Sequence, residues 1–374
     1  MRRHRITTVV GTRPEVIKMA PVIREIERRR DLFDHKLVTT AQHREMLDQA
    51  LEAFELKPDI DLGLMQDNQE LSKFASRALD VVSRVLSEIK PDLLLIQGDT
   101  TTVMTAALAA FHQGVQVGHV EAGLRSFDRL NPFPEETNRR LASCLADLHF
   151  APTERARLNL IREAVPREHI FVTGNTIVDA LKSISLADGF DDDLVGRMNL
   201  HGRRLLLVTA HRRETLGQPL RSICRALRTL ADTFEDIGIV YPVHLNPSVL
   251  AIVREELGDA ERIYLTPPLS YVDTLRLIKA CYLVLTDSGG IQEEAPSFHK
   301  PVLVLRNVTE RPELTEVNAG KLVGTDTSRI VEAATRLLTD RREYELMSEA
   351  DNPFGDGHAA ERIVNLLAGH LSNS

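Results

Sequence analysis

The feature that most constrains this chain is an alternation that runs through nearly all of it. Short runs rich in Leu and β-branched residues are separated by longer amphipathic stretches. Apolar runs of this kind are typical of parallel strands buried on both faces, and the stretches between them are typical of covering helices. The pattern predicts an α/β fold. In the first half we expect strands at 6–10, 36–40, 93–97, 116–119, 148–151 and 169–173, with helices such as 15–30 and 102–111 between them.

The alternation loosens between Asn175 and His201 and then resumes. A chain of 374 residues is also long for one core, so we predict two domains joined in this region, each with a parallel sheet of about six strands. The second series of strands is expected at 204–209, 238–243, 262–265, 282–286, 302–306 and 321–323.

Composition narrows the possible partners and the compartment. The formal net charge of -8 argues against nucleic acid and against an anionic membrane surface, because both attract a dominant basic field. Cys144, Cys224 and Cys281 are far apart and odd in number, which predicts neither a disulfide framework nor a zinc site. No apolar run has the length of a signal-peptide core or of a membrane helix, so we expect a cytoplasmic protein without a metal.

Ligands of open parallel sheets bind beyond the carboxyl ends of the strands, so the residues just after each apolar run are informative. After the first run, Thr12 and Glu15 are spaced as a capping box at the start of a helix. Arg13 projects from that turn and Lys18 lies on the helix, so both cations could face the cleft between the two predicted domains. The alternative is a capped helix with solvated charges.

Acidic residues follow the next strands of the first half. Asp99 comes after the run 93–97, Glu121 after the run 116–119, and Glu135 lies in a later segment that also contains Arg139. Clustered carboxylates raise one another's proton affinity and suit general acid and base catalysis. Two simpler interpretations stay open: taken alone, Asp99 is better explained as a helix N-cap, and acids are common on surface loops.

The second half carries candidate anion-binding groups at its strand ends. His211 and Arg212 follow one strand and His244 follows the next, although single histidines are often structural. The strongest pattern is Ser288-Gly-Gly290 between a buried strand and a helix, because free amides and the helix dipole form a cradle for a diphosphate. A plain glycine-rich turn is the alternative. Glu294 could accept hydrogen bonds from ribose hydroxyls, and Arg311 offers a further cation.

Missing motifs exclude other chemistry. The chain has no glycine-rich loop ending in Lys-Ser or Lys-Thr, which argues against nucleoside triphosphate hydrolysis. Gly355–Ala360 matches a dinucleotide fingerprint by its letters, but it does not follow a strand and too little chain comes after it. We therefore expect no nicotinamide site and no cofactor.

Taken together, these strings resemble the bacterial non-hydrolysing UDP-N-acetylglucosamine 2-epimerases. The match spans nearly the whole chain, and its longest strings are Thr40–Met46, His119–Arg125, Tyr241–Pro247 and Asp287–Pro296. The resemblance implies a glycosyltransferase-B-like fold, in which two Rossmann-like domains with parallel sheets face a central cleft. It places the domains at 1–180 and 200–355, with a last helix at 356–374 that returns to the first domain.

The resemblance also implies a reaction: reversible 2-epimerisation of UDP-N-acetylglucosamine to UDP-N-acetylmannosamine. UDP is eliminated to give 2-acetamidoglucal and is then added back, supplying an activated sugar for cell-surface polysaccharides. Matched positions imply four catalytic residues: Asp99, Glu121, Glu135 and His211. Positions matched to substrate binding are Arg13, Lys18, Arg139, His211, Leu269, Thr274, Ser288, Gly289, Gly290, Glu294 and Arg311.

Further expectations come from the same resemblance. A second, allosteric UDP-N-acetylglucosamine site is implied at Gln42, His43, Arg212 and His244, and a homodimer is expected. Two departures bear on these expectations. Thr274 stands where many relatives have an aromatic residue, so Tyr271 is the remaining candidate for stacking on the base, and 65–69 lacks an Arg that some members place there.

Three rival functions remain open from the sequence. A glycosyltransferase of the same architecture would pass the sugar to an acceptor, and a sensor would bind the UDP-sugar without turnover. A hydrolysing epimerase would release UDP and free N-acetylmannosamine.

Overall fold

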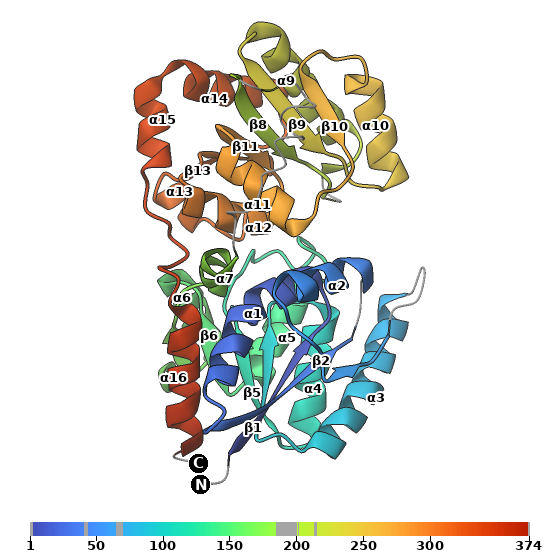
Figure 1. The fold of residues 1–374 in the computed structure, drawn as a ribbon, viewed down its shortest axis with the longest axis vertical. Helices are drawn as coiled ribbons and strands as arrows, with labels where there is room; N and C mark the ends of the chain where they lie inside the picture. The colour runs from blue at the N-terminus through green and yellow to red at the C-terminus, as the bar shows by residue number, and fades with distance from the viewer. Residues whose placement is uncertain are drawn as a thin grey trace. The chain divides into compact units, whose positions relative to one another are not determined.

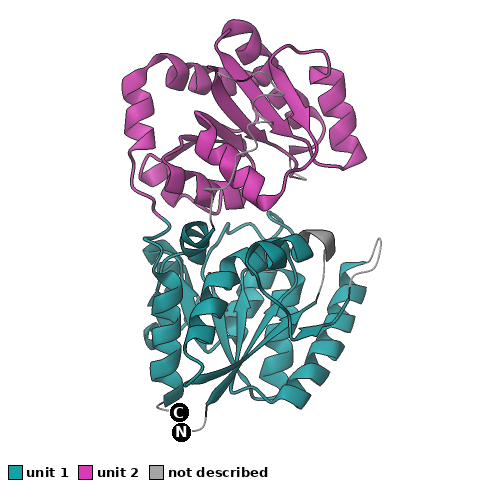
Figure 2. Ribbon diagram, in the orientation of Figure 1, with its two compact units in different colours: residues 1–184, 354–374 teal, residues 185–353 magenta. Residues whose placement is uncertain are grey.

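The computed structural model describes residues 3–40, 44–64, 70–184, 200, 202–212 and 215–372. The chain divides into two compact units, coloured separately in Figure 2. Unit 1 comprises Met1–Ile184 and Phe354–Ser374, and unit 2 comprises Ser185–Pro353. Among the described residues, no helix combines the length and the apolar character needed to cross a membrane.

Unit 1 is built on a parallel sheet of seven strands in the order β3-β2-β1-β4-β5-β6-β7. The central strand β4 has the sequence LLLIQ and is buried throughout, as expected for a strand covered on both faces. The strands are β1 (His4–Val10), β2 (Phe33–Thr39), β3 (Ile60–Asp61), β4 (Leu93–Gln97), β5 (Gln116–Val120), β6 (Leu148–Ala151) and β7 (Ile170–Val172).

Helices cover both faces of this sheet (Figure 1). They are α1 (Arg13–Arg28), α2 (Arg44–Ala53), α3 (Leu71–Ile89), α4 (Thr101–His112), α5 (Glu135–Leu145), α6 (Glu154–Arg162), the 3-10 turn η1 (Arg167–His169), α7 (Thr176–Ser183) and α16 (Ala359–Ser372). Helix α3 buries one stripe, Phe74, Ala78, Val82 and Leu86, at the spacing that one helix face requires, and it packs against α4. Helix α16, at the end of the chain, packs against α1 and α7 of the same unit.

Unit 2 repeats the architecture with six parallel strands in the order β10-β9-β8-β11-β12-β13. Its strands are β8 (Arg204–Thr209), β9 (Ile237–Pro242), β10 (Ile263–Thr266), β11 (Leu283–Thr286), β12 (Val302–Val304) and β13 (Gly320–Leu322). Its helices include α9 (Gln218–Thr233), α10 (Pro247–Leu257), α11 (Tyr271–Ala280), α12 (Gly289–Glu294), the 3-10 turn η3 (Ala295–Phe298), α13 (Glu313–Glu316), α14 (Thr327–Thr339) and α15 (Arg341–Ser348).

The predicted α/β class with two parallel sheets is confirmed. One strand was not predicted: β3 is only two residues long and lies at the edge of its sheet, so it leaves no apolar run in the sequence. The predicted capping box is wrong. Thr12 is the N-cap residue of α1 but makes no side-chain capping hydrogen bond, and Glu15 accepts the amide N–H of Gly11 at 2.5 Å instead of that of Thr12.

Candidate active site

The carboxyl ends of β4 and β5 bring two predicted acids to one edge of the unit 1 sheet. Gln97 pairs with Val120 at the ends of these neighbouring strands, and the amide of Gly98 donates to the carbonyl of Val120 at 3.1 Å. Asp99 and Glu121 follow directly, so the sheet register places them at the same edge. The β1 to α1 turn lies there too, because β1 pairs with β4 on its other side.

Glu121 is paired with a cation from α1. The Nζ of Lys18 donates to its Oε2, and both side chains are buried. The backbone of Glu121 is left-handed, with φ of 63°, a conformation that costs a residue with a Cβ roughly 1 kcal/mol or more. The fold thus maintains an unfavourable backbone conformation at a predicted catalytic position.

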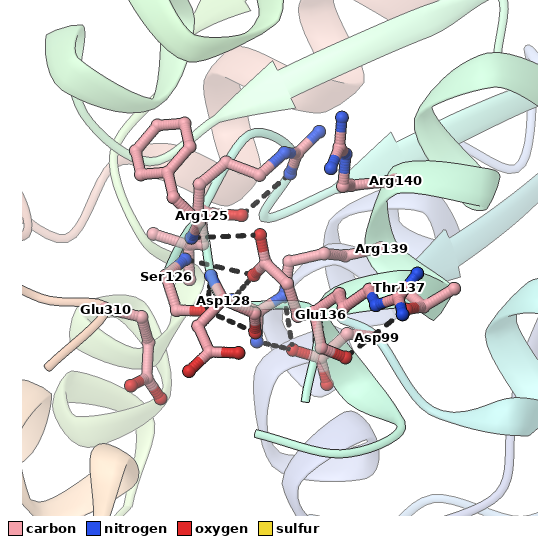
Figure 3. Close-up of polar contacts among 12 residues, drawn as sticks. Asp99, Arg125, Ser126, Asp128, Glu136, Thr137, Arg139, Arg140 and Glu310 are labelled. Atoms are coloured by element: carbon pink, nitrogen blue, oxygen red, sulfur yellow. Dashed lines mark hydrogen bonds and ion pairs between the residues drawn. The ribbon is translucent and has the colours of Figure 1, made fainter. Parts of the chain in front are cut away.

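Asp99 is held by Arg139 of α5 (Figure 3). The Nε of Arg139 donates to Oδ2 of Asp99 at 3.1 Å, its Nη2 donates to the same oxygen, and its Nη1 donates to Oε2 of Glu136 at 3.2 Å. Taken alone, Asp99 was better explained as a helix N-cap, and that interpretation is wrong. The N-cap of α4 is Thr100, whose hydroxyl accepts the amide of Val103. The Asp99 carboxylate instead accepts hydrogen bonds from Arg139.

Glu135 and Arg13 begin helices in the same unit. Glu135 is the first residue of α5, directly before Glu136, and Arg13 is the first residue of α1. Both side chains are half-buried. Together with Lys18 and Arg139, unit 1 therefore contains the three predicted carboxylates and three cations on α1, α5 and the turns after β4 and β5.

Two further groups near Asp99 were not predicted from the sequence as part of the site. Burial, assisted by the charge of Asp99, raises the pKa of the Glu15 carboxyl to about 7. His119 is buried on β5, with Nε2 at 2.8 Å from the carbonyl of Gly98, and burial lowers its pKa to about 3. His119 is therefore neutral and donates from Nε2 to the turn that carries Asp99.

In unit 2, a buried aspartate fixes the segment after β8. Oδ2 of Asp287 accepts the amides of His211 and Arg212 at 2.7 and 2.8 Å and the hydroxyl of Thr215 at 2.9 Å. The imidazole of His211 stacks on that of His244, with ring centroids 5.2 Å apart. The two predicted histidines are therefore neighbours, brought together by adjacent strands β8 and β9.

The glycine turn after β11 lies against an arginine. Ser288 is the N-cap of α12, and a Cβ added to Gly289 would lie 2.5 Å from Nη1 of Arg311. Arg311 is itself buried between two acids, donating from Nε to Glu293 at 2.6 Å and from Nη1 to Glu310. Glycine is required at this position because the guanidinium occupies the space of a side chain.

The remaining predicted positions are dispersed over unit 2 or lie outside the described residues. Glu294 is buried at the end of α12, Leu269 is half-buried before α11, and the hydroxyl of Thr274 donates to the carbonyl of Ser270 within that helix. Tyr271, the alternative stacking residue, is buried. Gln42 and His43 lie outside the described residues, so Arg212 and His244 are the two members of the predicted second site that the structure describes.

Sequence reasoning missed the groups that hold these residues in place: Glu136, Asp287, Glu293 and Glu310. Each lies directly beside a predicted site residue, but the sequence does not show which amide or guanidinium each carboxylate binds in the fold. Within the described parts of the chain, no group of three or more His, Cys, Asp or Glu is arranged to hold a metal ion.

Comparison with known proteins identifies the family. The family model for UDP-N-acetylglucosamine 2-epimerase matches residues 24–368. The UDP-N-acetylglucosamine 2-epimerase of Escherichia coli strain K12 is 48% identical, over 97% of this chain and 98% of its own.

Two solved structures are similar over their full lengths. The UDP-GlcNAc 2-epimerase of Neisseria meningitidis bound to UDP-GlcNAc is 43% identical with a TM-score of 0.91, covering 97% of this chain and 99% of its own. The Methanocaldococcus jannaschii enzyme in complex with UDP-GlcNAc and UDP is 35% identical with a TM-score of 0.84, at the same coverage. The glycosyltransferase-B-like fold class and the resemblance noted in the sequence are confirmed: this chain belongs to the UDP-N-acetylglucosamine 2-epimerase family.

Proposed function

We propose that this enzyme interconverts UDP-N-acetylglucosamine and UDP-N-acetylmannosamine without releasing free sugar. The observation that carries the proposal is the pairing of carboxylates with cations at one sheet edge of unit 1, Asp99 with Arg139 and Glu121 with Lys18. The hydrogen-bonded ion pairs orient both carboxylates, which suits proton transfer to and from carbon. Relatives bound to UDP-GlcNAc support the choice of substrate.

The reaction proceeds by elimination and addition. A carboxylate removes the C2 proton, the C–H electrons form a C1–C2 double bond, and the C1–O bond breaks so that its electrons leave with the β-phosphate of UDP. The products of this step are 2-acetamidoglucal and UDP. Protonation of C2 from the opposite face and attack of the phosphate oxygen on C1 complete the epimerisation. Asp99, Glu121 and Glu135 supply the acid and base groups.

Unit 2 would hold the nucleotide. The amides of Gly289 and Gly290 at the start of α12 and the guanidinium of Arg311 beside Gly289 suit a diphosphate. His211 would contact the leaving diphosphate, and Glu294 would accept hydrogen bonds from the ribose. Leu269 and Thr274 would contact the uracil, while Arg13, Lys18 and Arg139 would add positive charge from unit 1.

A regulatory second UDP-N-acetylglucosamine site is proposed at Gln42, His43, Arg212 and His244. The stacking of His244 on His211 supports it, because a ligand that moves one ring would also displace the other. A homodimeric, cytoplasmic enzyme that serves polysaccharide synthesis is the accompanying proposal.

The test is an analysis of products. Incubation of the purified protein with UDP-N-acetylglucosamine alone should give UDP-N-acetylmannosamine by NMR, with a mass equal to that of the substrate. Free N-acetylmannosamine with stoichiometric UDP would instead identify a hydrolysing enzyme. Turnover that begins only when a sugar acceptor is added would identify a glycosyltransferase.

A further inference from the structure

The acidic pair at the start of α5 divides into two environments. Glu135 is half-buried, whereas Glu136 is 1% exposed. Oε2 of Glu136 accepts the amide of Ser126 at 3.0 Å and Nη1 of Arg139 at 3.2 Å, and its Oε1 accepts the amide of Phe127 at 3.2 Å. Figure 3 shows this carboxylate between the Ser126 turn and the guanidinium. The carboxylate oxygens of Glu136 therefore accept hydrogen bonds from groups of the protein itself.

Arg139 transmits the position of Glu136 to Asp99. The guanidinium is planar, and it is held by Glu136 at one end and by Oδ2 of Asp99 at the other, which fixes its plane. Exposure changes along this row: the side chains of Glu136 and Arg139 are 1% and 5% exposed, whereas that of Asp99 is 25% exposed. The row therefore begins in the interior and ends at Asp99, its most exposed member.

The same face of α5 holds the loop that follows Glu121. Ser143, one helical turn beyond Arg139, accepts from Nη2 of Arg125 at 3.0 Å and donates to the carbonyl of Arg139 at 2.9 Å. Glu136 fixes the next residues of that loop, Ser126 and Phe127, the second of which has a left-handed backbone with φ of 62°. One helix face thus organises both acid-bearing segments.

We propose that Glu136 is a positioning residue for the epimerisation: it holds Arg139 against Asp99 and fixes the Ser126–Phe127 turn, without touching the substrate. The inference rests on the proposed function insofar as Asp99 acts on the sugar. Loss of the Glu136 charge would release one end of the guanidinium, so Asp99 would lose its fixed orientation while the nucleotide-binding groups stayed intact.

The first test is the Glu136→Gln variant of the full chain. We expect kcat to fall roughly 10- to 100-fold with the KM for UDP-N-acetylglucosamine within about threefold, the pattern of an interaction needed in the transition state. Arg140→Gln is the matched control, because Arg140 is the next charged residue of α5 but its side chain is 55% exposed. Wild-type kcat in Glu136→Gln would overturn the proposal.

A stability cycle tests the inference without relying on activity. In thermal unfolding of wild type, Asp99→Asn, Glu136→Gln and the double variant, the losses in Tm should be non-additive, because both residues act through Arg139. Non-additive losses in a protein that does not epimerise would sink the proposed function but keep the positioning. Additive losses in an active enzyme would overturn the positioning alone.

The Glu136→Asp variant decides the matter if the Gln variant does not fold. It keeps the charge but withdraws it by one methylene. A fall in kcat of at least about fivefold at unchanged KM supports the proposal, and a wild-type kcat contradicts it.

Discussion

Charged residues at the unit 1 sheet edge are distinguished by how their charge is compensated. Lys18 and Glu121 form a buried ion pair, and Arg139 is shared between Asp99 and Glu136. Burying an ion is costly unless it is paired and hydrogen-bonded, so these contacts offset the cost of burying charged side chains in this region. Glu15 differs, since burial has the largest effect on the pKa of its carboxyl.

Glu15 should make the stability of the protein depend on pH. Its pKa is raised to about 7 in the folded state, so the unfolded chain releases the proton at a lower pH than the folded chain does. Stability therefore falls as pH rises between the two pKa values, by about 3 kcal/mol in total. Glu15→Gln keeps an acceptor for the Gly11 amide but cannot ionise, so its Tm should rise relative to wild type from about pH 5 to about pH 8. A Tm difference that is constant across this range would show that Glu15 is not held protonated.

The left-handed backbone at Glu121 predicts an order of stability between two substitutions. Glu121→Ala and Glu121→Gly both remove the partner of Lys18, but only glycine adopts φ of 63° without a steric penalty. The Gly variant should be more stable than the Ala variant by about 1 kcal/mol, measured by denaturant unfolding, and both should lose epimerase activity. Equal or reversed stability would mean that the position carries no strain.

At the scale of elements, a carboxylate of α7 caps the last helix of unit 1. Asp179 of α7 accepts the amides of Ala359 and Ala360 at 3.2 and 2.8 Å and so caps α16. The amide of Asn175 donates to the carbonyl of Phe354 at 2.7 Å, which places the entry to this helix beside α7. The chain therefore leaves unit 1 after α7 and returns to it next to the same helix.

Removing this cap should loosen α16. Asp179→Ala should lower the free energy of unfolding of unit 1 by about 1 to 2 kcal/mol, the usual cost of a lost N-cap. Asp179→Asn retains one acceptor oxygen and should lose less. Chemical denaturation monitored by circular dichroism measures both, and an Ala variant as stable as wild type would show that this cap does not stabilise α16.

At the scale of the whole molecule, the sequence predicted those features that repeat locally. Period and run length located the two sheets and nearly all strands, with β4, β6 and β8 at their predicted bounds. It could not predict β3, which has two residues, or the partner of Asp99, because Arg139 lies forty residues away in sequence.

The candidate site, like the fold, was predictable from the sequence only where it depends on local patterns. Strand-end residues were found because parallel sheets collect ligands at one edge. The supporting role of Asp287 was missed because its hydrogen bonds to the segment after β8 depend on the tertiary fold. That of Glu136 was missed because its bonds to the Ser126–Phe127 turn depend on the path of the loop before α5. His211 and His244 were expected from strand order, but their stacking was not.

If carboxylates of unit 1 remove the C2 proton of the bound UDP-sugar, as proposed, that proton should be exchanged with solvent during turnover. The wild-type enzyme is incubated with UDP-N-acetylglucosamine in heavy water, without any acceptor, and C2 is followed by NMR. We expect deuterium at C2 of both epimers with the wild-type enzyme, and none with Asp99→Asn or Glu121→Gln. Epimerisation that retains the original proton at C2, or turnover without deuterium, would contradict it.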